Sequence, residues 1–543
     1  MFRKHQDEFG QLCFDLRTGA SPQLRSIICA TTPGGGKSLL PIIAASQLIP
    51  KIADRIAWVV PRRSLQSQAE SEFLAPRGRN LLGHNFAIRR SSNEADPCRG
   101  LAGFATTYQA IGVGNSHFIE AFSRHRFILV LDEPHHIEEG GAWEAAIAPL
   151  VRRAALTVYM SGTLERGNRK RIAFLPYRET SEGEIVDLAR TPQTAAIQYS
   201  RQDALIEKAI LPIHFELMDG TAEWIGRDGK SYGTRLSSAN KDTAEALYTA
   251  LKTQFAFQLL EECTGHWENY RQTHPRAKLL VVTAGIDDAK KYADALKKRG
   301  IRAAIATSDD STLAATNIEK FKGSGARAVD ALVTVAMAYE GLDVPAVTHI
   351  ACLTHIRSRP WIEQMIARAT RFDPAAGAWE EQTAYIYVPD DRLICSIIAR
   401  MQDDQLTAIK KMKEEDELGD LGRAAALPSE ERNRITPLGS SGHGRRWSRV
   451  GPSLAPQGAV MKAMPTPSQQ EANIREQIQD YCRQVDSLYF ERKWGETNRR
   501  VMKTFSRSRA DMRLSELQQV VKWLEYYYPL GRVQNKRASA ARR

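Results

Sequence analysis

Two short segments of the chain combine residue types that bind phosphate with residue types that activate water. The first, ATTPGGGKSLL (residues 30–40), follows an apolar run and precedes a helical pattern. Consecutive glycines let backbone N–H groups converge on a phosphate, and the N-terminus of the next helix adds its dipole. Lys37 is expected to reach the outer phosphates and Ser38 to place its hydroxyl on Mg²⁺. The loop glycines are expected to bind phosphate oxygens through their backbone N–H groups: Gly34, Gly35 and Gly36.

The second segment is LVLDEPHHIEEGG (residues 129–141), in which an apolar run ends at two adjacent carboxylates. Ending a buried strand this way is costly unless a cation compensates the charge. Asp132 is placed to hold Mg²⁺, and Glu133 to polarise an attacking water. A strand followed by a plain acidic turn is the alternative for this segment alone.

Bulk composition restricts the class of protein. The chain has 543 residues, 43% hydrophobic and 25% charged residues, and a formal charge of +12. This length predicts two or three domains, and the charge favours a polyanionic partner. Seven cysteines occur without a C-x-x-C pair, which argues for a reducing compartment. With neither a membrane-length apolar run nor a signal sequence visible, we expect a cytoplasmic protein without membrane contact.

Short, continuous apolar runs recur along the chain, each followed by a turn and a helical pattern. Such runs are typical of strands buried on both faces of parallel sheets. They form two groups, one before about residue 165 and one after about residue 278. We therefore expect an α/β fold with two tandem doubly wound domains and a helical C-terminal module.

The predicted boundaries follow from this grouping. Domain 1 is expected over residues 1–270, with 166–270 as a connecting segment, and domain 2 over 271–400. Residues 401–470 read as a charged helix and a linker rich in Pro, Gly and Ser. Residues 471–543 read as a basic helical tail.

Several motifs in a fixed order make residues 1–390 resemble the superfamily 2 helicases and translocases, specifically the DExH group that includes type III restriction-like helicases. The segments that carry the resemblance are FRKHQ (2–6), VVPRRSLQSQ (59–68), ATTYQAI (105–111), DEPH (132–135), SGT (161–163), VTVAMAYEGLDVP (333–345) and QMIARATR (364–371). Each motif alone is weak, and their joint order carries the identification. The resemblance implies two RecA-like domains with ATP and Mg²⁺ between them.

The resemblance also assigns roles outside the phosphate loop. Gln6 is the expected reader of adenine, and Gly341 and Asp343 belong to the ATP site. Arg368 and Arg371 are expected to reach the γ-phosphate from domain 2, although paired arginines are more often an exposed helix face. The residues expected to couple the nucleotide to nucleic acid are His135, Ser161, Thr163 and Gln364.

Contacts to the nucleic-acid backbone are implied for both domains. The residues are Pro61, Arg62, Thr106, Thr107, Thr283 and Thr334. Contacts to the phosphate backbone do not distinguish one base from another, so binding is expected to be sequence-independent and sensitive to salt. The basic charge and the restriction-like motifs favour an ATP-driven DNA helicase or translocase. An RNA helicase, or a nucleotide-switched ATPase subunit of a defence, restriction or recombination complex, stays as an alternative.

Three residues depart from the family pattern without removing a catalytic side chain. Thr31 stands where the strict phosphate-loop pattern has glycine, Pro134 replaces the usual alanine, and Ala367 replaces glycine. We therefore expect an active ATPase.

The tail resembles, faintly, small helical domains of phage-encoded proteins. Its aromatic residues stand among Lys and Arg, a mixture that can hold single strands. They are more commonly the core of a small helical domain, and the module is equally suited to dock a partner protein. The residues are Tyr489, Phe490, Trp494, Trp523, Tyr526, Tyr527 and Tyr528.

Overall fold

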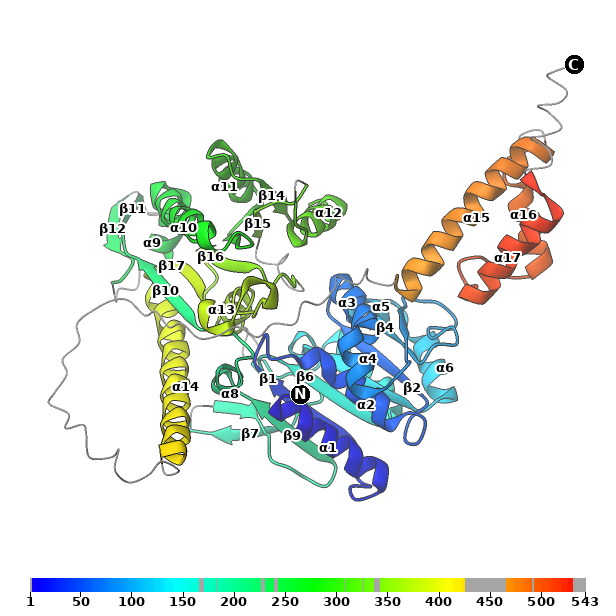
Figure 1. The fold of residues 1–543 in the computed structure, drawn as a ribbon, viewed down its shortest axis with the longest axis horizontal. Coiled ribbons are helices and arrows are strands. Elements are labelled where there is room, and N and C mark those ends of the chain that lie inside the picture. Colours follow the sequence, from blue (N-terminus) through cyan, green and yellow to red (C-terminus); the bar gives the residue numbers. More distant parts are fainter. Residues whose placement is uncertain are drawn as a thin grey trace, which may run out of the picture.

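Two layered α/β domains and a helical module make up the part of the chain that the structure describes (Figure 1). The computed structural model describes residues 2–165, 170–181, 183–225, 230–238, 243–307, 309–325, 327–335, 342–424, 465–490 and 493–530. Within these ranges, no helix combines the length and the apolar character needed to cross a lipid bilayer.

Domain 1 is built on a parallel sheet with the spatial order β3-β4-β2-β5-β6-β1-β9. Its strands are β1 (Ser26–Thr31), β2 (Arg55–Val60), β3 (Ile88–Arg90), β4 (Gly103–Thr107), β5 (Phe127–Asp132), β6 (Leu156–Ser161) and β9 (Thr194–Tyr199). Its helices are α1 (Lys4–Thr18), α2 (Leu40–Leu48), α3 (Arg63–Leu74), α4 (Pro76–Leu82), α5 (Tyr108–Val113), α6 (Ser116–Arg124), α7 (Ala142–Arg153) and α8 (Arg201–Ile206). A short antiparallel hairpin, β7 (Tyr177–Thr180) and β8 (Gly183–Val186), follows β6.

The continuous apolar runs predicted for buried strands are explained by two separate cores. Every residue of β5 is buried, with Ile128 and Val130 in one apolar cluster and Leu129 and Leu131 in another. The first cluster is closed by α1, α2 and α3, and the second by α5, α6 and α7. Because alternate side chains point to opposite faces of a strand, both must be apolar when helices cover both faces.

Domain 2 repeats this architecture with the spatial order β10-β17-β16-β13-β15-β14, also parallel. Its strands are β10 (Ile213–Met218), β13 (Lys278–Thr283), β14 (Ala303–Ala306), β15 (Ala331–Val335), β16 (Val347–Leu353) and β17 (Ala384–Pro389). Its helices are α9 (Thr243–Lys252), α10 (Gln254–Thr273), α11 (Ile286–Lys298), α12 (Ser311–Lys322) and α13 (Arg359–Ile366), with a hairpin of β11 (Thr221–Ile225) and β12 (Ser231–Arg235). The prediction of two doubly wound domains is confirmed.

The chain passes from domain 1 to domain 2 earlier than the sequence predicts. Strand β9 still pairs with β1, whereas β10 pairs with β17 in the second sheet. Cys263 and Trp267 of α10 are buried in the core of domain 2. The predicted boundary at residue 270 therefore needs correction to the stretch between α8 and β10. Strand β10 shows no continuous apolar run in the sequence because it lies at the sheet edge, where His214, Glu216 and Leu217 are exposed.

A long helix and a separate helical module complete the described chain. Helix α14 (Arg392–Ala424) follows domain 2, and the predicted linker after it, from residue 425 to 464, lies outside the described residues. The module comprises α15 (Pro467–Tyr489), α16 (Glu496–Phe505) and α17 (Leu514–Tyr527) around its own small core. It lies against domain 1, on the side away from α14 (Figure 1).

Candidate active site

The glycine-rich loop leaves β1 and enters α2 through a short 3₁₀ turn at Lys37–Leu39. Gly34 and Gly36 have φ angles of 83° and 88°, a left-handed conformation that favours glycine. A Cβ on Gly35 would lie 2.8 Å from both the Thr31 Cγ2 and the Thr32 carbonyl oxygen. Thr31 is still the last residue of β1, so the turn needs no glycine there. The three glycines thus form a cradle that substitution would fill.

Helix α1 fixes the backbone of this loop. Arg3 donates to the carbonyl oxygens of Gly34 and Gly35, and Gln6 donates from Nε2 to the Gly36 carbonyl oxygen at 3.0 Å. The Gln6 Oε1 accepts the Arg3 N–H at 3.0 Å, and Gln6 is only 2% exposed. Carbonyls held in this way cannot turn into the cavity, where they would repel a phosphate. The reading of adenine by Gln6 stays a prediction.

The two carboxylates at the end of β5 face the phosphate loop. The Lys37 Nζ lies 3.2 Å from the Asp132 Oδ1 and forms a second ion pair with Glu133. Burial lowers the pKa of Lys37, while Asp132 opposes the shift. Glu133 has a φ of 53°, which turns its side chain away from the direction of the strand. In this structure the Lys37 ammonium compensates the adjacent carboxylates of Asp132 and Glu133, and the compensation by Mg²⁺ stays a prediction.

Asp132 is also held by two aromatic residues that sequence reasoning did not assign. The Trp58 indole N–H donates to the Asp132 Oδ2 at 3.3 Å, and the Tyr108 hydroxyl donates to the Asp132 carbonyl oxygen at 2.8 Å. Trp58 lies in β2 and Tyr108 begins α5, directly after β4. Trp58 reads in the sequence only as part of an apolar strand, and Tyr108 lies in the ATTYQAI segment without a role assigned to it.

Glu133 is joined to the predicted coupling residues of β6. Its Oε2 accepts the Ser161 hydroxyl at 2.9 Å and the Gly162 N–H at 3.3 Å, and the His135 Nδ1 lies 3.4 Å away. The Ser161 Oγ in turn accepts the Thr163 N–H at 3.1 Å. The structure therefore brings His135, Ser161 and Thr163 together around one carboxylate.

Residues of domain 2 lie opposite the phosphate loop and the two carboxylates of domain 1. A cavity of about 380 Å³ lies between the domains and is lined by both sets of predicted residues. Its lining includes Lys37, Ser38, Asp132, Glu133, Asp343, Gln364, Arg368 and Arg371. Arg371 forms an ion pair with Asp343, and Arg368 donates to the Leu342 carbonyl oxygen at 3.2 Å. Burial lowers the pKa of Arg371 to about 10. Gly341 lies outside the described residues.

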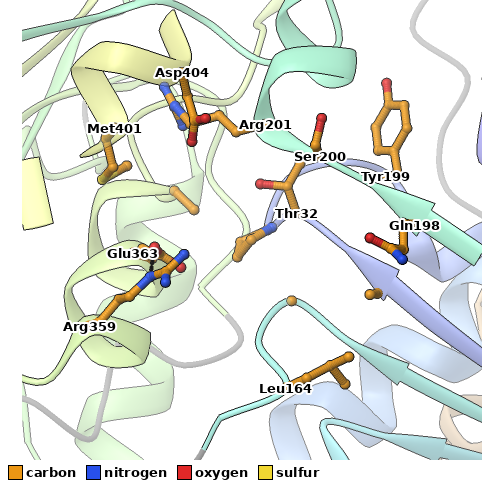
Figure 2. Close-up of a pocket in the computed structure, with 14 residues that line it drawn as sticks. Thr32, Leu164, Gln198, Tyr199, Ser200, Arg201, Arg359, Glu363, Met401 and Asp404 are labelled. Carbon is orange, nitrogen blue, oxygen red and sulfur yellow. Dashed lines mark hydrogen bonds and ion pairs between the residues drawn. The ribbon is translucent and has the colours of Figure 1, made fainter. Parts of the chain in front are cut away.

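A second interdomain cavity, of about 260 Å³, lies on the other side of the phosphate loop. Figure 2 shows Thr32 and Ser200 of domain 1 facing Arg359 and Glu363 of α13, which form an ion pair at 2.7 Å. Loop residue Pro33 borders both cavities. The phosphate loop therefore lies between two cavities. Because α13 lines both of them, a movement of this helix changes the shape of both cavities.

The predicted contacts to nucleic acid differ in how open they are. Pro61 and Arg62 follow β2 and are partly exposed. At the end of β4, Thr106 is fully buried and Thr107 caps α5. In domain 2 the hydroxyls of Thr283 and Thr334 are buried and donate to backbone carbonyls.

Thr283 and Thr334 therefore stabilise the sheet edge in this structure, and their hydroxyls are not open to a phosphate. Arg3 and His136 also line the interdomain cavity without having been assigned from sequence. Arg3 had a signal, because it lies in the FRKHQ segment that places Gln6.

Two family models match the chain in the order of the two domains. Residues 2–166 match the Type III restriction enzyme, res subunit, and residues 256–373 match the Helicase conserved C-terminal domain. The chain carries a superfamily 2 helicase core. Together the two matches contain every residue that lines the larger interdomain cavity except Ala209 and Pro374.

The core also resembles curated proteins of mycobacteria. An uncharacterized protein of Mycobacterium tuberculosis (strain CDC 1551 / Oshkosh) is 26% identical over 374 residues, and one of Mycobacterium leprae (strain TN) is 23% identical over 375 residues. Each alignment covers 68% of this chain. The chain spans 58% and 59% of the length of these two relatives.

Solved structures with a similar arrangement include two nucleic-acid complexes. The ATP-dependent type ISP restriction-modification enzyme LlaBIII bound to DNA has a TM-score of 0.45 at 14% identity, covering 72% of this chain and 28% of that one. The Mycobacterium smegmatis helicase Lhr bound to ssDNA and AMP-PNP has a TM-score of 0.45 at 13% identity, covering 74% and 50%.

Proposed function

We propose that this helicase core is an ATP-driven DNA helicase or translocase. The observation that carries the proposal is the shared cavity, because Lys37, Asp132 and Glu133 of domain 1 face Arg368 and Arg371 of domain 2 across it. A site divided between two domains makes hydrolysis depend on their closure. Cycles of closing and opening can then drive movement along a strand.

The phosphates of ATP fit the loop cradle. Gly34, Gly35 and Gly36 offer backbone N–H groups at a helix N-terminus, and Lys37 reaches the β- and γ-phosphates. When ATP enters, the Lys37 ammonium exchanges its carboxylate partners for phosphate oxygens. A smaller cavity of about 150 Å³ beside Gln6 and Arg3 is the proposed place of the adenine.

Magnesium is the metal that the donor set fits. Ser38 and Asp132 offer a hydroxyl and a carboxylate, hard oxygen donors of the kind that Mg²⁺ takes together with phosphate oxygens. Among the residues that the structure describes, the buried Asp132 Oδ1 has one ion-pair contact, with the Lys37 Nζ at 3.2 Å. When bound, Mg²⁺ neutralises phosphate charge as it develops.

Glu133 is the proposed general base. Its carboxylate orients a water molecule in line with the γ-phosphorus and accepts a proton from it as the new P–O bond forms and the bond from the γ-phosphorus to the bridging oxygen breaks, releasing ADP. Ser161, the Gly162 N–H and His135 hold the Glu133 Oε2 in place. Arg368 and Arg371 stabilise the charge that develops on the γ-phosphoryl oxygens. Gln364 of α13, the helix that ends at Ile366 just before these arginines, lines the same cavity.

Nucleic acid is proposed to lie along the carboxyl edges of both sheets. In domain 1 the contacts come from Pro61, Arg62 and the β4 end at Thr106 and Thr107. In domain 2 we propose backbone groups around Thr283 and Thr334, since both hydroxyls are internally bonded. Backbone contacts of this kind do not read sequence, and salt weakens them.

The test is steady-state ATP hydrolysis without polymer and with single-stranded DNA, duplex DNA or RNA. Stimulation by DNA is expected, and Glu133→Gln should lower turnover by about 10²- to 10⁴-fold while ATP still binds. Glu139→Gln is the matched control, because this carboxylate is half exposed on the same segment. Stimulation by RNA alone would reassign the substrate. A flat response to every polymer would contradict a motor and favour a subunit that a protein partner triggers.

A further inference from the structure

The C-terminal module is fixed to domain 1 by a buried ion cluster. Glu471, near the start of α15, is 3% exposed and accepts from Arg89 at 3.2 Å, Arg99 at 2.9 Å and Arg475 at 3.0 Å. Arg99 also donates to the carbonyl oxygens of Met512 and Ala510, just before α17. These hydrogen bonds join one buried carboxylate to several guanidinium groups. They fix the first turns of α15 and the segment before α17 against domain 1 and so set the orientation of both helices.

This attachment lies beside the proposed nucleic-acid contacts of domain 1. The Ser468 N–H donates to the Glu70 Oε1 at 2.9 Å, and the Ser468 hydroxyl accepts the Arg90 N–H at 3.1 Å. Glu70 belongs to α3, the helix that starts at Arg63 directly after Pro61 and Arg62. The base of the module therefore touches the same helix whose N-terminus is proposed to hold phosphate.

The far ends of α15 and α17 lie together, away from domain 1 (Figure 1). The Tyr489 hydroxyl donates to the Pro529 carbonyl oxygen at 3.1 Å, and the rings of Phe490 and Tyr528 have centroids 5.7 Å apart. The Arg500 guanidinium lies 4.4 Å from the Phe490 ring centroid. Helix α15 has 23 residues, so this end lies about 34 Å from the base.

Aromatic residues at this far end exceed what the module core uses. The core consists of Ile478, Cys482, Val501, Met512, Leu517, Val520 and Leu524, with Trp523 and Tyr528 packed against it. Trp494, Tyr526 and Tyr527 are 61%, 79% and 58% exposed. The expectation that the tail aromatics form a core therefore holds for Trp523 and Tyr528 and is wrong for these three. We call Trp494, Tyr526 and Tyr527 the exposed aromatic group.

Positive charge accompanies the exposed aromatic group. Lys493 precedes Trp494, and Arg499 and Arg500 stand in the first turns of α16, where both pair with Glu496. Exposed rings with cations around them match the stacking and charge of a single strand.

We propose that the exposed aromatic group is a second contact for single-stranded nucleic acid. The module then acts as a rigid arm that guides the strand leaving the Pro61–Arg62 contact of domain 1. Bases stack on the aromatic rings while the basic residues meet the phosphates, so this contact is also independent of base sequence. The inference rests on the proposed function, because it extends the path of the same strand.

The test compares the full chain with the triple variant Trp494→Ala, Tyr526→Ala and Tyr527→Ala. Fluorescence anisotropy measures the binding of labelled 40-nucleotide oligo(dT) and oligo(rU). The variant should bind oligo(dT) about tenfold or more weakly, with unchanged ATP hydrolysis in the absence of nucleic acid. Tyr248→Ala is the matched control, because this ring is 56% exposed with Lys252 close to it, but on α9 of domain 2.

A 5-nucleotide oligo(dT) adds a test of reach. Even fully extended it is no longer than the arm of about 34 Å, so it cannot hold the domain 1 contact and the exposed aromatic group together, and the variant should lose less affinity for it than for the 40-mer. Equal affinity of the variant and the full chain for the 40-mer would overturn the proposal and leave this surface to a protein partner. If the full chain itself neither binds an oligonucleotide nor responds to one in ATP hydrolysis, the proposed function fails, a result distinct from the first.

Discussion

Trp58 donates its indole N–H to the carboxylate of Asp132 across 3.3 Å, with both side chains nearly buried. Tyr108 holds the carbonyl of the same residue at 2.8 Å. Trp58 lies two residues before the end of β2, and Pro61 follows that strand. Tyr108 directly follows Thr107 at the end of β4. Strands β2 and β4 lead to the proposed nucleic-acid contacts of domain 1. A residue near the end of each strand therefore donates a hydrogen bond to Asp132, the residue proposed to hold Mg²⁺.

Trp58→Phe is expected to raise the Mg²⁺ concentration needed for half-maximal ATP hydrolysis by roughly tenfold, because partners that orient a metal ligand set its affinity. The ring is kept, so packing changes little. Titrating Mg²⁺ at saturating ATP measures the effect. Trp267→Phe is the control, since that buried indole donates to the Ala277 carbonyl oxygen in the core of domain 2. An unchanged Mg²⁺ requirement in Trp58→Phe would contradict the role.

Pro33 of the phosphate loop and Gly162 of the SGT segment are closely fitted to each other. A Cβ on Gly162 would lie 2.7 Å from the Cγ of Pro33, so the glycine of the SGT segment makes room for the proline of the phosphate loop. We expect Gly162→Ala to lower ATP turnover by displacing the loop. The double variant Pro33→Ala, Gly162→Ala should recover much of that loss, because the clashing ring is gone.

A double-mutant cycle on kcat measures this coupling. Gly140→Ala is a poor match, because Gly140 has a φ of 76°, and Gly10→Ala in α1 is the better control, since its nearest neighbour would be 3.4 Å away. Additive effects of the two substitutions on kcat would show that Pro33 and Gly162 are not coupled.

Arg371→Lys is expected to lower kcat by 10²-fold or more, because an arginine aimed at transferring phosphate supplies a large share of the rate and lysine cannot donate in the same fork. Binding of a fluorescent ATP analogue should change much less. Arg276→Lys is the control, since this half-exposed arginine of domain 2 pairs with Asp373 at 3.1 Å. Equal loss of binding and turnover would instead indicate that Arg371 only anchors Asp343.

The sequence predicts the chemistry of domain 1 better than the geometry of domain 2. Lys37, Asp132 and Glu133 are predictable because a glycine cradle and an acidic strand end are local patterns. Trp58 is not, since an indole inside an apolar strand looks like any core residue until the sheet places it beside Asp132. Thr283 and Thr334 were assigned by motif alone, and only the strand pairing shows that their hydroxyls are bonded across the sheet.

A buried histidine pair in domain 2 predicts loss of stability in acid. His349 is fully buried, its Nε2 lies 2.9 Å from the His266 Nδ1, and burial lowers its pKa to about 3. The unfolded chain binds this proton below about pH 6.5, whereas the folded chain does not bind it until about pH 3. The free energy of unfolding therefore decreases as the pH is lowered, by about 2 kcal/mol between neutral pH and pH 5. Urea unfolding at pH 7 and pH 5 should show a smaller loss for His349→Gln than for the unaltered chain. His214 is exposed, so His214→Gln should show the same loss of stability as the unaltered chain. Equal losses between pH 7 and pH 5 in the unaltered chain and both variants would refute the assignment to His349.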